Sequence, residues 1–217
     1  MTRAEDDKVT PVNDQTTPPQ PSEGDEFRTF VFGQRGTLLA LPAVVLAAAG
    51  KPSAFSIATG LPLAFLGEAI RMWAVGYSGA TTRSDRVTAP SLVTAGPYAY
   101  VRNPLYVGNV LTAAGFAVAF TGKNSAAVRA ALVAGSLAAI VGVYAVIVPH
   151  EEAYLRATFG RAFDEYTERV PPVVPLVEPA EPQHGSYDPD VIPQAESRTF
   201  LTFGAMLAVL AFKALRA

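Results

Sequence analysis

The stretch TAGPYAYVRNPLYVG, residues 94–108, marks the place where a polar loop turns into an apolar helix. Gly96-Pro97 is a turn signal. Asn103 followed by Pro104 is typical of a helix start, because Asn caps the first turn and Pro suits its first position. We therefore predict a helix that begins at Pro104. The residues after it are mostly apolar, so its free N–H groups are expected at a membrane surface.

Around this helix start, the chain contains apolar segments of about the 20 residues that cross a bilayer. Hydrophobic residues make up 50% of the 217 residues and charged residues 17%, less than the share of about 25% in soluble domains. The pattern predicts an all-α integral membrane bundle of about five transmembrane helices. The expected spans are roughly Phe30–Ala49, Ser53–Tyr77, Pro104–Thr121, Ala126–Val148 and Arg198–Leu215.

Linker lengths and small residues predict how these helices pack. The linkers at Lys51 and Lys123 are short, so the first and second helices, and the third and fourth, are expected to form antiparallel hairpins. Small residues in the third and fourth helices, such as Gly108, Gly115 and Gly135, allow close approach. The alternative is that they only reflect a composition rich in Ala. Pro149 is expected to end the fourth helix.

Composition divides the chain into four parts. Residues 1–28 are polar and are expected to form a disordered tail, without the order of a signal peptide. Residues 29–175 form the expected membrane core, with four transmembrane helices and an interfacial helix. Residues 176–197 are a loop rich in Pro and acids, and residues 198–217 are the fifth transmembrane helix.

The distribution of Lys and Arg predicts the orientation. With the N-terminus in the cytoplasm, most basic residues, among them Arg83, Arg86, Arg102 and Arg156, lie on the cytoplasmic side. The loops that carry the candidate motifs then face the cytoplasm as well.

Several classes of function are excluded or disfavoured. The formal net charge of -2 gives no basic field for nucleic acid. Without cysteines the chain has no disulfide, thiolate metal site or cysteine nucleophile. Its two histidines are far apart in the sequence, which disfavours a zinc site. Nothing in the sequence indicates the oligomeric state.

Two further groups of polar residues stand out. Glu151 and Glu152 follow the fourth helix, and an amphipathic helix with Leu155 and Phe163 on one stripe is expected to close a pocket on the cytoplasmic side. The alternative is that the two acids are ordinary interfacial charges. Glu68 and Arg71 share a face of the second helix. They form either a structural ion pair or a site at which Arg71 binds a substrate oxygen.

Together these motifs resemble the isoprenylcysteine carboxyl methyltransferase family and its relatives among the phospholipid methyltransferases. The resemblance covers roughly residues 61–175. One departure is Asn103, which stands where the family usually has His. The residues that match the family's three motifs are Gly67, Glu68, Arg71, Trp73, Ala74, then Gly96, Pro97, Tyr98, Arg102, Pro104, Tyr106, Gly108, then Glu151, Glu152, Leu155, Phe159, Gly160 and Tyr166.

The resemblance implies S-adenosylmethionine as cofactor and a lipophilic acceptor that enters from the bilayer. Arg102 and the helix start at Pro104 are then expected to hold the cofactor's carboxylate, and Glu151 or Glu152 its ammonium or ribose hydroxyls. Tyr98 and Tyr106 are expected to enclose the adenine. The complete set of expected cofactor-binding residues is Gly96, Pro97, Tyr98, Arg102, Asn103, Pro104, Tyr106, Glu151 and Glu152.

Arg71 and Glu152 are the expected catalytic residues. Arg71 is expected to orient an acceptor carboxylate, which needs no base, whereas an amine or hydroxyl acceptor would need Glu152 or His150 as a base. Two alternatives are a membrane reductase of the sterol type, which uses NADPH, and a member of the fold without turnover.

Overall fold

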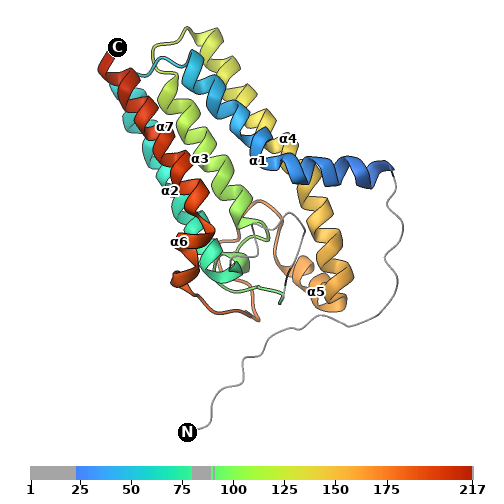
Figure 1. The fold of residues 1–217 in the computed structure, drawn as a ribbon. Helices are drawn as coiled ribbons and strands as arrows, with labels where there is room; N and C mark the ends of the chain where they lie inside the picture. Colours follow the sequence, from blue (N-terminus) through green and yellow to red (C-terminus); the bar gives the residue numbers. More distant parts are fainter. Residues whose placement is uncertain (1–22, 80–88, 90, 217) are drawn as a thin grey trace.

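The computed structural model describes residues 23–79, 89 and 91–216, and within these ranges every regular element is a helix (Figure 1). This confirms the predicted all-α class. Residues 1–22 of the expected tail and the loop that contains Arg83 and Arg86 lie outside the described residues. The long helices are α1 (Glu23–Ala49), α2 (Ala54–Ser78), α3 (Pro104–Phe120), α4 (Ala126–Phe159) and α7 (Ser197–Arg216). The short ones are η2 (Gly96–Ala99), α5 (Arg161–Arg169), η3 (Pro189–Val191) and α6 (Ile192–Ala195).

Helices α2 and α3 begin where the sequence predicts, but for different local reasons. Ser53 and Ser56 form a reciprocal capping box at the start of α2. At the start of α3, Asn103 occupies the cap position, but its side chain makes no capping hydrogen bond. Its Nδ2 instead donates to the carbonyl oxygen of Pro172 at 3.0 Å. The expected side-chain cap is therefore wrong, and Pro104 alone marks this helix start.

Glycines bring α2 and α3 into close contact. A methyl group added at Gly115 of α3 would overlap the backbone of Ala64 in α2, and one added at Gly60 would overlap Gly115. Gly67 and Gly108 approach each other in the same way farther along the two helices. The expected role of small residues is confirmed on α3. On α4 it is not, because Gly135 faces open space.

The pairing of the helices differs in part from the expected hairpins. Helix α3 contacts α4, as predicted. Helix α1, however, packs along α4 and makes little contact with α2, so the expected hairpin of the first two helices is wrong (Figure 1). The bundle therefore has α2, α3 and α7 on one side and α1 with α4 on the other.

Helix α4 continues beyond its expected end. Pro149 lies inside the helix, which ends at Phe159, before Gly160 adopts a positive φ of 53°. Proline removes one backbone hydrogen bond, but the turns after it bury Phe159 in a cluster with Phe163 of α5. This buried contact stabilises the added turns, which a local stop signal does not reveal. Helix α4 thus carries Glu151 and Glu152 on a rigid element.

Length, composition and exposure together favour a membrane environment. Within the described residues, α4 and α7 are long and apolar enough to cross a membrane, and only 22% and 6% of their most apolar stretches are buried. Apolar surface of this extent is expected to face lipid rather than water. The apolar parts of α1 and α3, Gly33–Ala49 and Pro104–Phe120, are shorter. The number of five spans stays a prediction.

Replacing Gly115 tests the contact between α2 and α3. We expect Gly115→Ala to destabilise the protein by about 1–3 kcal/mol, because the added methyl group forces the two backbones apart. Gly135→Ala is the matched control, since its methyl group meets no neighbour and Ala favours a helix. The measurement is the midpoint of thermal unfolding in detergent. Equal midpoints for the two variants would contradict the close contact.

Candidate active site

The loop before α3 forms one wall of the candidate site. Gly96 has a φ of 62° and lies directly against the ring of Tyr77, where a side chain would not fit. A glycine at position 96 therefore allows both the positive φ of the turn and the close approach to the Tyr77 ring. The turn η2 follows with Pro97 buried, and the Tyr98 side chain lines the cavity described below.

Arg102 joins this loop to α4 and α5. Its Nε donates to Glu152 Oε1 at 2.9 Å, and its Nη1 donates to the carbonyl oxygens of Val170 at 2.7 Å and Thr167 at 3.2 Å. These carbonyls lie at the end of α5, where a helix lacks internal donors and attracts positive charge. Only 12% of the Arg102 side chain is exposed. The structure thus brings Arg102 and Glu152 together. Both were expected to bind the cofactor, but their side chains bind each other.

The segment after α5 forms a strap along the same loop. The backbone N–H of Arg102 donates to Pro171 O, that of Leu176 to Tyr100 O and that of Ala180 to Ala99 O, each at 2.9 Å. Farther along, the N–H of His184 donates to Thr94 Oγ1 at 2.8 Å. The segment 171–184, expected as the end of the core and the start of a loop, is therefore part of the site.

A cavity of about 910 Å³ opens between the loop, the strap and helices α1 to α4 and α7. Its walls are mixed but more polar than those of the smaller cavity described below, so it is called the polar cavity. Of the expected site residues, Gly96, Pro97 and Glu152 do not line it. Residues that the sequence did not indicate also line it, among them His184, Asp188 and Glu196. No spacing or motif distinguishes these three in the sequence. The expected residues that do line the cavity are Arg71, Tyr98, Arg102, Asn103, Pro104, Tyr106 and Glu151.

The phenols at the loop are held neutral. Burial raises the pKa of Tyr98 to about 12, although a hydrogen bond with Ser78 opposes the change. Burial likewise raises the pKa of Tyr166, whose hydroxyl donates to the carbonyl oxygen of Tyr98 at 2.8 Å. At neutral pH both side chains therefore offer an aromatic face and a neutral hydroxyl, and neither is a base.

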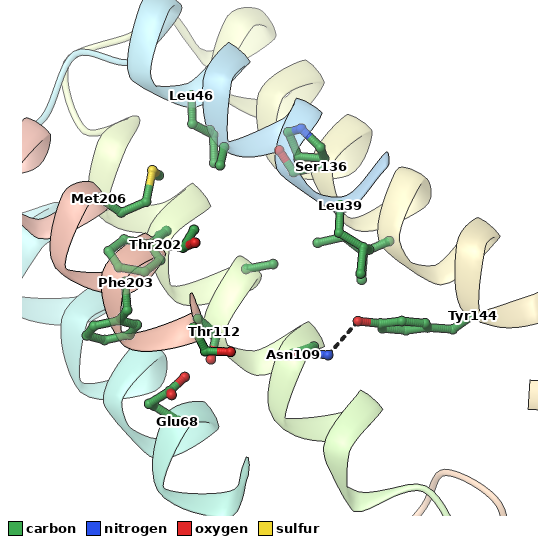
Figure 2. A pocket seen from close by; sticks show the side chains of 16 residues that line it. Leu39, Leu46, Glu68, Asn109, Thr112, Ser136, Tyr144, Thr202, Phe203 and Met206 are labelled. Atoms are coloured by element: carbon green, nitrogen blue, oxygen red, sulfur yellow. Dashed lines mark hydrogen bonds between the residues drawn. The ribbon is translucent and has the colours of Figure 1, made fainter. Parts of the chain in front are cut away.

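Deeper in the bundle, a second cavity of about 160 Å³ has mostly apolar walls (Figure 2). It lies between α1, α3, α4 and α7, with Leu39, Phe203 and Met206 among its lining residues. Asn109 donates from its Nδ2 to the Tyr144 hydroxyl at 2.6 Å, across the space between α3 and α4. Both residues also line the polar cavity, so the two cavities adjoin.

Arg71 lies where the two cavities meet, and its main partner is far away in the sequence. Its Nη2 donates to both oxygens of Glu196, at 2.9 and 2.8 Å, and its Nη1 donates to Asn109 Oδ1. Glu68, the expected partner, is 3.8 Å from Arg71 Nε. Arg71 and Glu68 thus form the ion pair that the sequence allows, together with a closer acid that the sequence did not indicate, and the binding of a substrate oxygen by Arg71 stays a prediction.

Among the described residues, no group of three or more His, Cys, Asp or Glu side chains is arranged to hold a metal ion.

Removing Arg102 tests whether it joins α4, α5 and the loop. We expect Arg102→Ala to lower the free energy of unfolding by about 3 kcal/mol or more, because it leaves the carboxylate of Glu152 without this partner. Hydrogen exchange of the amides in 161–172 should quicken. Arg161→Ala is the control, because Arg161 pairs with Glu165 at the surface with 91% of its side chain exposed. Similar exchange in both variants would refute this role.

Comparison with known proteins finds similarity over about half of the chain. The family model of the phospholipid methyltransferases matches residues 55–162. Protein-S-isoprenylcysteine O-methyltransferase B of Arabidopsis thaliana is 34% identical over 122 residues, 54% of this chain and 58% of that protein. Two probable protein-S-isoprenylcysteine O-methyltransferases, of Oryza sativa subspecies indica and japonica, are each 32% identical over 123 residues, 55% of this chain and 61% of theirs. The alignments thus cover less than two thirds of these relatives. No solved structure matches the chain significantly.

The matched segment reaches from the start of α2 to the start of α5. It contains Arg71, Arg102 and Glu151, so the resemblance seen in the motifs is confirmed by the family model and by the relatives. Residues 55–162, just under half of the chain, thus match the phospholipid methyltransferase family, and over a similar length the chain is related to plant isoprenylcysteine O-methyltransferases.

Proposed function

We propose that this protein transfers a methyl group from S-adenosylmethionine to the carboxylate of a prenylcysteine-like or other isoprenoid or lipid acceptor. The proposal rests on one observation: two cavities adjoin, and one has a more polar lining than the other. The polar one is lined by residues of the family motifs, such as Arg102 and Glu151, and the apolar one adjoins it inside the bundle. A polar donor and a lipophilic acceptor need such a pair of neighbouring spaces.

The polar cavity suits S-adenosylmethionine in size and chemistry. Its volume of about 910 Å³ lies within the range of pockets that bind ligands of this kind. The N-terminal end of α3, which begins at Pro104, presents the positive end of the helix dipole to a carboxylate. Glu151 and Tyr106, which share a hydrogen bond, offer acceptors and an aromatic face. These groups match the cofactor's carboxylate, ammonium, hydroxyls and adenine.

The expected residues then divide into two groups. Tyr98, Tyr106 and Glu151 line the polar cavity and are proposed to touch the cofactor. Glu152 instead binds Arg102, so we propose that it holds the guanidinium in place. Gly96 and Pro97 shape the turn that presents Tyr98.

When bound, S-adenosylmethionine supplies a methyl group made electrophilic by the sulfonium. The protein's part is to align acceptor and donor and to exclude water. Apolar side chains such as Phe203 and Met206 are proposed to hold the acceptor's chain in the smaller cavity. Its head group then points to the junction, where Arg71 lies. A carboxylate acceptor needs no base, in agreement with the neutral phenols at the loop.

We further propose a multi-pass topology with this site on the cytoplasmic side. Figure 1 places α5 and α6 at one end of the bundle and the C-terminal end of α7 at the other. The first end carries Arg102, Arg156, Arg161, Arg169 and Arg198, and the far end carries Lys51, Lys123, Arg129, Lys213 and Arg216. The excess on the first side comes from the sequence, which adds Arg83 and Arg86 between α2 and η2. Positive residues concentrate on the cytoplasmic side of membrane proteins, which supports this orientation.

Binding of S-adenosylhomocysteine to the detergent-purified protein tests the cofactor. We expect calorimetry to detect binding by the wild type, and binding about tenfold weaker or worse by Glu151→Gln, which loses a charge-assisted acceptor. Glu168→Gln is the control, because Glu168 is exposed on α5 and does not line the cavity. A folded wild type that binds NADPH instead favours the reductase. One that binds neither ligand favours a protein without turnover.

A further inference from the structure

The ion pair between Arg71 and Glu196 is the most deeply buried one at the candidate site. Only 11% of the Arg71 side chain and 1% of the Glu196 side chain are exposed. Both carboxylate oxygens of Glu196 lie within hydrogen-bond distance of Arg71 Nη2. A carboxylate is the natural partner of a guanidinium, so an acceptor's carboxylate would seek the same donors of Arg71 that Glu196 occupies.

The position of this pair matters for any acceptor. Arg71 and Glu196 line the polar cavity, while Glu68, close to Arg71, lines the apolar one. Asn109 and Thr199, which both accept hydrogen bonds from Arg71, line both cavities. An acceptor with its chain in the apolar cavity and its head toward the polar one therefore meets Arg71 together with Glu196.

Glu196 comes from a part of the chain outside the matched family segment. It lies between α6 and α7, and its backbone is fixed on both sides, because its N–H donates to Ile192 O and its carbonyl oxygen accepts from Phe200 N, both at 2.8 Å. The turn thus delivers the carboxylate to Arg71 from a rigid support. The segment 55–162 supplies the guanidinium and the C-terminal segment supplies the acid.

We propose that Glu196 occupies the place of an acceptor carboxylate on Arg71 and is thereby a specificity-determining residue, an internal competitor of acidic acceptors. This inference rests on the proposed function and refines it, because it names Glu196 as the residue that limits the binding of acidic acceptors. With Glu196 in place, a second carboxylate meets like charge and a guanidinium whose Nη atoms are already engaged. The carboxylate of the acceptor therefore reaches Arg71 only in exchange for Glu196, whereas the uncharged methyl ester that forms from it does not compete for Arg71 in this way.

Binding of an acid and its ester tests the proposal without any methyl transfer. S-farnesylcysteine and its methyl ester are titrated into purified protein that lacks a methyl donor. Glu196→Gln keeps an oxygen for Arg71 but removes the negative charge. We expect it to strengthen binding of the acid on the order of tenfold and to leave binding of the ester unchanged. Asp190→Asn, an exposed change on the same segment, should alter neither.

The outcomes separate this inference from the proposed function. If the wild type methylates S-farnesylcysteine but Glu196→Gln leaves the ratio of acid to ester affinity unchanged, or weakens the acid, Glu196 is no competitor although the function stands. If the wild type neither binds S-adenosylhomocysteine nor methylates any acceptor, the proposed function fails instead. Should Glu196→Gln not fold, Glu196→Asp withdraws the carboxylate from Arg71 and should shift the ratio in the same direction, more weakly. An unchanged ratio in that variant also overturns the inference.

Discussion

The guanidinium of Arg102 is the interaction on which the arrangement of the site depends. It lies just before α3, yet its donors reach Glu152 on α4 and the carbonyls of Thr167 and Val170 at the end of α5. A single buried cation thus fixes elements that are distant in sequence. Because the strap follows α5 directly and pairs with the same loop, its path is fixed too. The polar cavity is the space that these tethered parts enclose.

The close contact of α2 and α3 has a complementary role on the other side of the cavity. Gly60 and Gly115 let two helices approach without intervening side chains, so Arg71 and Asn109 can reach each other across them. The wall formed by α2 and α3 is therefore held by backbone contact, and the wall formed by the loop, α4 and α5 is held by the ion pair of Arg102 with Glu152. The two walls meet near Tyr106, which stacks on Tyr144 with ring centroids 4.3 Å apart. This division explains how a small bundle holds both a polar and an apolar space.

Local signals in the sequence were sufficient for the class of fold and for the motifs. Pro104 marks a helix start because its geometry is set within a few residues, and apolar length indicates spans in the same local way. The pairing of α1 with α4 was not predictable from linker length, since it depends on side-chain fit between distant helices. Pro149 was misleading, because contacts of Phe159 outweigh the lost hydrogen bond. No local sequence pattern marks Glu196 as a site residue, and its place at the site becomes apparent only from its contact with Arg71.

The contact between Arg71 and Glu196 also has a consequence for how the protein is made. Arg71 belongs to α2, whereas Glu196 precedes α7 and leaves the ribosome after every other long helix described here. In the proposed multi-pass topology, the α2 guanidinium therefore enters the bilayer before its closest counter-charge has been synthesised. Glu68, on the same helix and 3.8 Å away, can accompany it until then. The turn before α7 then adds Glu196 as a second and closer counter-charge, so Arg71 is shared between an acid of its own helix and one delivered late in synthesis.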